Sequence, residues 1–179
     1  MSLNTTPSAE RTHIGIFGRR NAGKSSLINA LTGQSLAIVS DVKGTTTDPV
    51  LKAMELLPLG PVVMIDTPGI DDEGNLGSMR VQKAFQILNK TDLALLVIDS
   101  LSGPSHEDAV TLAHIQKKEI PFLVVLNKSD QIEDLDHAVQ KAADFLQVSK
   151  EKLMTASASS GYHIQELKEA IAFLAPKED

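Results

Sequence analysis

Hydrophobic residues along the chain alternate between short continuous runs and stretches in which they recur with helical spacing. A short apolar run between turn residues is typical of a buried strand, whereas apolar residues three or four positions apart form the buried stripe of a helix. The runs predict strands at 13–17, 49–57, 62–66, 93–99, 121–127 and 152–156. The helical spacing predicts helices at 24–31, 79–90, 105–118, 134–147 and 163–175.

This order of elements predicts an α/β fold with a six-stranded, mostly parallel sheet and helices on both faces. The strands at 49–57 and 62–66 are joined by a turn, "LPLGP" at 57–61, with no helix between them. We therefore expect them to form an antiparallel pair at one edge of the sheet. We expect one domain over 13–175, preceded by a flexible, polar segment at 1–12 and followed by a short tail at 176–179.

Composition narrows the classes of function. The chain has 179 residues, of which 42% are hydrophobic, and a formal net charge of −6. An acidic balance disfavours broad nucleic-acid binding, so we expect no nucleic-acid partner. The sequence contains no cysteine, which excludes disulfides and thiolate metal sites within it. No apolar run is long enough to span a membrane and no secretory signal opens the chain, so we expect a cytoplasmic protein without a membrane partner.

A glycine-rich segment between the first strand and the first helix matches the pattern G-x-x-x-x-G-K-[ST]. It consists of Gly18, Arg19, Arg20, Asn21, Ala22, Gly23, Lys24 and Ser25, and Ser26 follows. Such a loop wraps its backbone amides around phosphates. Lys24 would reach the β- and γ-phosphates, and Ser25 would place its hydroxyl on Mg²⁺. A chance glycine loop is the alternative, but the flanking strand and helix provide the required context. The loop alone does not separate GTP from ATP.

The segment "VVLNKSD" indicates which base is bound. Asn127, Lys128 and Asp130 follow a buried strand, at the edge where open parallel sheets bind ligands. The carboxylate of Asp130 can accept both N1–H and the 2-amino group of guanine, which adenine does not offer. Asn127 would bond the N7/O6 edge and tie this segment to the glycine loop, and the stem of Lys128 would cover the base. Ser157-Ala158, in "TASASSG", is a weaker candidate whose amide would meet O6, with a generic serine-rich turn as the alternative.

Two further segments are candidates for the metal and for sensing the γ-phosphate. In "MIDTPG" (64–69), Asp66 would hold the Mg²⁺ shell through water, and the amide of Gly69 would contact the γ-phosphate. In "DVKGTTTDP" (41–49), the hydroxyl of Thr46 would complete the Mg²⁺ shell, with Thr45 as the alternative and a threonine-rich turn as the plain structural interpretation.

In this order, the motifs resemble the five guanine-nucleotide motifs of the translation-factor-class GTPases. Asn21 and "GTTTD" are similar to the TrmE/Era group within that class. The segments "VSDVKGTTTDPVLKAMELLPLGPV" and "IDTPGIDDEGNLGSMRVQKA" resemble the N-terminal G domain of the HydF family, the maturation GTPases of FeFe-hydrogenase. The resemblance implies a P-loop NTPase fold of the GTPase type, with GTP and GDP as ligands and Mg²⁺ as cofactor.

The resemblance also implies a potassium ion, held by Asn21 and by backbone carbonyls between Val42 and Gly44. Among the expected catalytic residues are Lys24, Thr46 and Gly69. Ras-like proteins carry a water-orienting glutamine where this sequence has Ile70, so we expect slow intrinsic hydrolysis. The nearby acids are Asp71, Asp72 and Glu73, and nothing singles one out. We expect Arg19 and Arg20 to be exposed loop residues rather than arginine fingers.

The resulting hypothesis is a GTP-hydrolysing molecular switch in hydrogenase maturation and metallocluster assembly. The HydF resemblance implies maturation partner proteins, engaged through domains outside this chain, and a homodimer. One alternative is a tRNA-modification or ribosome-assembly GTPase of the TrmE/Era type. Another is a nucleotide-binding interaction module with negligible turnover.

Overall fold

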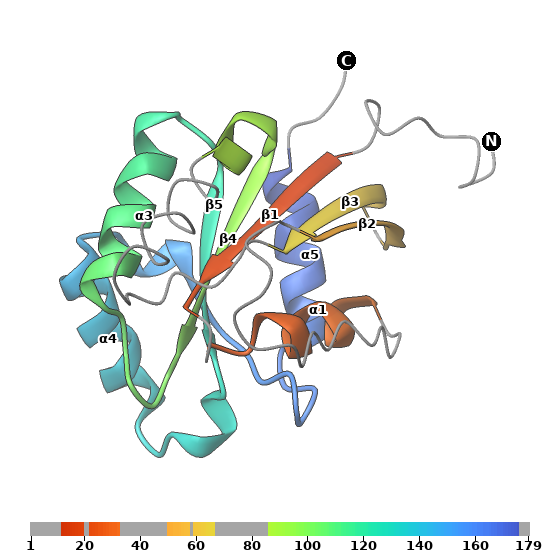
Figure 1. Cartoon of the computed structure of the whole chain (residues 1–179). Coiled ribbons are helices and arrows are strands. Elements are labelled where there is room, and N and C mark those ends of the chain that lie inside the picture. The colour runs from red at the N-terminus through yellow and green to blue at the C-terminus, as the bar shows by residue number, and fades with distance from the viewer. Residues whose placement is uncertain (1–11, 20–21, 33–49, 58, 67–85, 176–179) are drawn as a thin grey trace.

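The computed structural model describes residues 12–19, 22–32, 50–57, 59–66 and 86–175 (Figure 1). The strands are β1 (Thr12–Gly18), β2 (Val50–Leu56), β3 (Gly60–Asp66), β4 (Leu93–Asp99), β5 (Phe122–Asn127) and β6 (Leu153–Thr155). The helices are α1 (Lys24–Thr32), α3 (His106–Lys117), α4 (Leu135–Leu146) and α5 (Ile164–Leu174). Short 3₁₀ turns are η4 (Leu88–Lys90), η5 (Ser129–Gln131) and η6 (Lys150–Lys152).

The strands form one six-stranded sheet in the order β2-β3-β1-β4-β5-β6. β2 pairs antiparallel with β3, and the other neighbouring strands pair in parallel. This confirms the predicted sheet with its antiparallel edge strand. After β1, the next two strands, β2 and β3, lie between β1 and one edge of the sheet, whereas β4, β5 and β6 follow one another toward the opposite edge. The order of strands therefore reverses between β1 and β4. Ligands of open α/β sheets bind outside the carboxyl ends of the strands at such a reversal.

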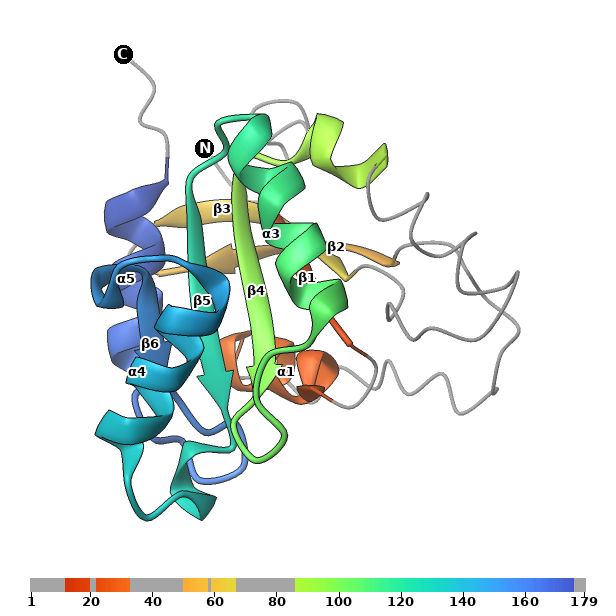
Figure 2. The ribbon, with the colours of Figure 1, turned by 90° about the vertical axis from the view of Figure 1, so that its left-hand side faces the viewer.

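Helices cover both faces of the sheet, as predicted. α1 and α5 lie on one side, and α3 and α4 lie on the other (Figure 1) and face the viewer in Figure 2. The alternation of side chains along each strand builds two cores. In β1, Ile14 and Ile16 join the core beneath α1 and α5, whereas Phe17 joins the core beneath α3 and α4. All three side chains are fully buried, which fixes the sheet between its helical layers.

The structure changes some predicted boundaries. β1 begins at Thr12, one residue before the predicted start of the domain. Of the helix predicted at 79–90, the described part covers 86–90, where a helical turn at 86–87 continues into η4. The turns η5 and η6 were not predicted, because a single 3₁₀ turn is too short to show a hydrophobic period. The segments 1–11 and 176–179 lie outside the described residues. Among the residues described, no helix has the length and apolar character needed to cross a membrane.

Candidate functional site

Most of the candidate residues that the structure describes lie where parallel strands end, at one edge of the sheet. Gly18 is the last residue of β1, and Asp66 is the last residue of β3, which pairs in parallel with β1. Asp99 and Asn127, the last residues of β4 and β5, are directly paired. Segments far apart in the sequence therefore converge on one edge because parallel strands point the same way.

The glycine loop needs glycine at both ends. Gly18 has φ +146°, and a Cβ there would collide with the carbonyl oxygen of Val97. Gly23 has φ +88°, and a Cβ there would stand 2.5 Å from Nδ2 of Asn127. Backbone bonds close the loop, since the amide of Ala22 donates to the carbonyl of Arg19 (3.1 Å). The backbone thus approaches neighbouring elements more closely than a residue with a side chain allows.

Lys24 begins α1, and its side chain turns back across the loop. Nζ donates to the carbonyl of Gly18 at 3.0 Å, and the residue is only 6% exposed. Ser25 follows at a half-buried position and Ser26 at an exposed one. A buried ammonium at the start of a helix concentrates positive charge at the point where phosphates would enter.

Asp66 lies near the start of α1 and carries the one unsatisfied buried polar side-chain atom in the described part of the chain, Oδ1. Burial raises the pKa of the Asp66 carboxyl, while the charge of Lys24 and a hydrogen bond from Ser25 oppose the rise. A carboxylate oxygen without a partner, close to a serine hydroxyl, is a hard oxygen donor set of the kind that Mg²⁺ prefers. The residues present therefore fit the expected metal.

Asn127 connects three segments. Its Nδ2 donates to the carbonyl of Ala22 at 3.0 Å, and its Oδ1 accepts from the amide of Ala158 at 3.1 Å. The side chain is 2% exposed. The expected tie between this segment and the glycine loop is therefore present. The amide of Ala158, which we expected to meet guanine O6, donates to Asn127 in this structure.

Asp130 and Ser157 are also held together. Ser157 is fully buried, and its hydroxyl donates to Oδ1 of Asp130 at 2.7 Å. The neighbouring Ser129 fastens the same two segments, since its amide donates to the carbonyl of Ala156 at 3.1 Å and the amide of Ala156 donates to its hydroxyl at 3.2 Å. The serine-rich turn is thus bonded directly to the candidate base-recognition segment, and the role of Ser157-Ala158 in base recognition stays a prediction.

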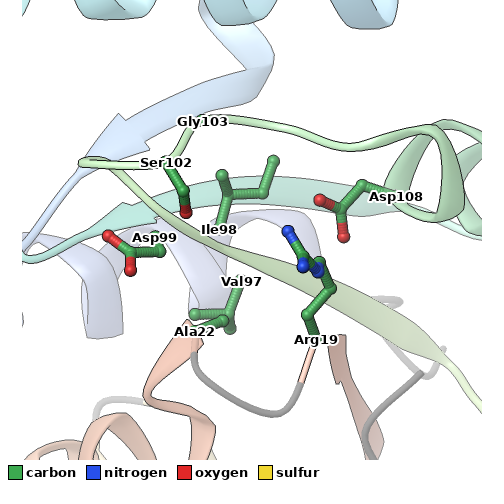
Figure 3. Close-up of a pocket in the computed structure, with 8 residues that line it drawn as sticks. All are labelled: Arg19, Ala22, Val97, Ile98, Asp99, Ser102, Gly103 and Asp108. Carbon is green, nitrogen blue, oxygen red and sulfur yellow. The ribbon is translucent and has the colours of Figure 1, made fainter. Parts of the chain in front are cut away.

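Two acidic residues near the loop were missed by the sequence analysis. Arg19 is half-buried and points toward Asp108 across a hollow (Figure 3), so the expectation that it is an exposed loop residue is wrong. Burial raises the pKa of the Asp108 carboxyl, and hydrogen bonds from Ser105 and the charge of Arg19 oppose the rise. Asp99 lines the same hollow and bonds Lys128, Nζ to Oδ2, at 3.1 Å. Its place at the end of a buried strand was the signal that could have revealed it.

Several candidate residues lie outside the described residues. They are Arg20, Asn21, Val42, Gly44, Thr45, Thr46, Gly69, Ile70, Asp71, Asp72 and Glu73. Their expected roles in potassium binding, metal binding and γ-phosphate sensing stay predictions.

Comparisons with known proteins show the family. The family model described as "50S ribosome-binding GTPase" matches residues 13–128. GTPase Der of Wolinella succinogenes is 38% identical over 179 residues, which cover 94% of this chain and 36% of that protein. The tRNA modification GTPase MnmE of Helicobacter acinonychis is 34% identical over 167 residues, which cover 93% of this chain and 36% of that protein. The chain thus spans about a third of the length of these relatives.

Solved structures agree with the sequence relatives. An Era variant of Aquifex aeolicus bound to GDP·AlF₄⁻ has a TM-score of 0.77 at 27% identity, covering 93% of this chain and 57% of that one. Era in complex with MgGDPNP and nucleotides 1506–1542 of 16S ribosomal RNA also has a TM-score of 0.77, at 29% identity, covering 94% of this chain and 58% of that one. The chain is therefore a P-loop GTPase domain similar to those of Der, MnmE and Era, and it belongs to the 50S ribosome-binding GTPase family.

Proposed function

We propose that this chain binds GTP with Mg²⁺ and hydrolyses it to GDP and phosphate, acting as a molecular switch within a longer protein. The observation that carries the proposal is the pair of hydrogen bonds made by Asn127, to Ala22 and to Ala158. They join the expected phosphate loop to both segments expected to recognise the base. A ligand that spans this junction needs phosphates at one end and a base at the other, which describes a nucleotide.

Guanine recognition is assigned to Asp130. Adenine would offer this carboxylate no donor, whereas guanine supplies two, and a missing partner at a polar site is the strong form of discrimination. Ser157 supports this role because its hydroxyl bonds one carboxylate oxygen at 2.7 Å and so limits the rotation of the side chain. Lys128 would lay its stem along the base.

Phosphate binding is assigned to the loop amides and Lys24, and Mg²⁺ binding to Ser25, Asp66 and Thr46. Mg²⁺, when bound, neutralises negative charge on the phosphates. The ammonium of Lys24 already lies against the loop at the carbonyl of Gly18, so it needs little rearrangement to reach a phosphate. Potassium at Asn21, Val42 and Gly44 would stabilise charge that develops during cleavage. Without potassium we expect slow turnover, because Ile70 follows "DTPG" where Ras-like proteins carry a water-orienting glutamine.

The comparisons favour a role in RNA-related assembly or modification over hydrogenase maturation. The relatives reported above are a GTPase Der and a tRNA modification GTPase, and one Era structure contains 16S ribosomal RNA. They lend no support to HydF in particular. The expectation that nucleic acid is not a partner also loses its support, because the RNA-bound Era chain extends well beyond the part covered here. We therefore propose the Der/MnmE/Era type of function, with RNA contacts made by the longer protein.

The test is steady-state phosphate release from GTP and from ATP with Mg²⁺, in matched KCl and NaCl. We expect turnover of GTP alone, faster in potassium. Asp130→Asn should weaken the binding of GTP and favour the binding of xanthosine triphosphate, whose altered base edge suits an amide. Asp136→Asn removes an exposed carboxylate from the first turn of α4 and should keep the preference for GTP. Equal use of ATP would contradict the assignment of Asp130, and GTP binding without turnover in either salt would favour the interaction module.

A further inference from the structure

Lys128 has an unusual backbone conformation, and its side chain extends to Asp99. Lys128 lies between β5 and η5 with φ +64° and ψ +29°, the left-handed region that residues other than glycine seldom occupy. The residue before it is held from the β4 side, because the amide of Ser100 (3.0 Å) and its hydroxyl both donate to the carbonyl of Asn127. The peptide group that leads into Lys128 is thus fixed to the end of β4.

The side chain of Lys128 ends at Asp99. Its Nζ lies 3.1 Å from Oδ2 of Asp99, and the exposed fractions of the two side chains are 33% and 11%. The loop after β4 is built around the same carboxylate, since Oδ1 accepts from the amide of Leu101 at 2.8 Å and the carbonyl of Asp99 accepts from the amide of Gly103 at 2.8 Å. One carboxylate oxygen therefore closes the loop and the other bonds the lysine.

Asp99 and Asp130 are two carboxylates near Lys128, one through the fold and the other in the sequence, and they differ in exposure to solvent. Asp130 is exposed and follows Lys128 by two residues, whereas Asp99 is largely buried at the end of β4. Water and salt screen a charge pair at an exposed carboxylate more strongly than at a buried one. The environment therefore favours pairing of the ammonium with Asp99, which leaves Asp130 available to donors from a ligand.

We propose that Asp99 is a positioning residue for guanine recognition: it holds the ammonium of Lys128 at the end of β4, so that the stem lies in one conformation and the ammonium stays away from Asp130. This inference rests on the proposed binding of guanine nucleotides. A lysine side chain is flexible, and replacement of Asp99 removes the partner that draws its ammonium away from the carboxylate expected to accept the 2-amino group. Loss of Asp99 should then cost both affinity and discrimination.

Two variants separate this role from a merely structural one. Asp99→Asn keeps a side-chain oxygen that can accept from Leu101, so the loop is retained, but it removes the charge that attracts Lys128. Lys128→Met keeps an unbranched stem and removes the ammonium. Asp92→Asn is the matched control, since Asp92 lies just before the other end of β4 and accepts from the amide of His13. Thermal melting without nucleotide checks that each variant is folded.

The measurement is the dissociation constant of GDP and of inosine diphosphate, which lacks the 2-amino group, with Mg²⁺. We expect Asp99→Asn to raise the dissociation constant of GDP about tenfold, as is typical for a lost hydrogen bond to a charged group. The variant should also show a smaller preference for GDP over inosine diphosphate. Lys128→Met should weaken GDP by a smaller factor and keep the preference, because no ammonium is left to cover Asp130. In the double variant, adding Asp99→Asn to Lys128→Met should change neither constant by more than about twofold.

The outcomes are distinct. Failure of the wild type to bind GDP would overturn the proposed function and this inference with it. Normal binding by the wild type, with an Asp99→Asn variant within twofold of it, would overturn this inference alone. An equal effect of Asp99→Asn with and without Lys128→Met would also overturn it, because Asp99 would then act through the loop and not through the lysine. If Asp99→Asn does not fold, the Lys128→Met variant decides, since unchanged GDP affinity there contradicts a positioned lysine.

Discussion

Replacement of Asn127 by alanine should destabilise the protein even without nucleotide. The variant removes the donor to the carbonyl of Ala22, which is buried, and the acceptor for the amide of Ala158, which is partly buried. A buried polar group left without a partner costs about 1–3 kcal/mol, and partial access to water places the second group at the low end of that range. The side chain also leaves a site that is 2% exposed, so a small cavity adds to the loss.

The expected total is about 2–5 kcal/mol, which is a large part of the roughly 5–15 kcal/mol that stabilises a typical domain. The assay is urea unfolding of the nucleotide-free protein, in which the midpoint should fall while the dependence on denaturant stays the same. Asn89→Ala is the matched control, because Asn89 is exposed and its side-chain oxygen accepts a hydrogen bond from the exposed Nζ of Lys118. That change should stay within about 0.5 kcal/mol of the wild type.

A loss below about 1 kcal/mol for Asn127→Ala would refute the reasoning, since it would mean that water satisfies both freed groups. In that case Asn127 would not join the phosphate loop to the base-recognition segments in the absence of ligand. A loss in the expected range, accompanied by a flatter dependence on urea, would instead indicate that the native or unfolded state itself had changed.

Three further predictions concern neighbouring residues. Lys24→Ala should abolish tight GTP binding in a titration, and retained micromolar affinity would contradict the assignment of the phosphate loop. Gly23→Ala should destabilise by about 2–4 kcal/mol in urea, since a Cβ would meet Asn127 at 2.5 Å and φ is +88°, whereas Gly161→Ala, at φ +81° with open space around it, should cost about 1 kcal/mol from strain alone. Burial raises the pKa of Asp108 in the folded state, so its contribution to stability is lost as pH rises through that pKa. The free energy of unfolding of Asp108→Asn relative to the wild type should therefore rise as the pH increases above the ordinary carboxyl pKa of 3.8, and a difference that is flat or falls with pH would contradict this.

The secondary structure and the class of fold could be predicted from the sequence because they depend on local patterns. The apolar run at 93–99 has the same bounds as β4, and the spacing at 134–147 predicts α4 to within one residue at each end. The antiparallel edge follows from a five-residue turn that leaves no room for a crossover helix. In each case the signal lies within one short stretch of sequence, where hydrophobic periodicity and turn residues determine the local backbone structure.

Recognition of the glycine loop and of "NKSD" was also local, because each motif keeps its chemistry within a few consecutive residues. Partners across the fold were different. The pairing of Lys128 with Asp99 spans 29 positions, and that of Asn127 with Ala22 spans 105. Arg19 follows β1 and Asp108 lies in α3, which follows β4, so the two residues face one hollow because β1 and β4 are neighbours in the sheet. Strand order and backbone direction decide which side chains meet, and these depend on packing of the whole domain, so only the tertiary structure could supply them.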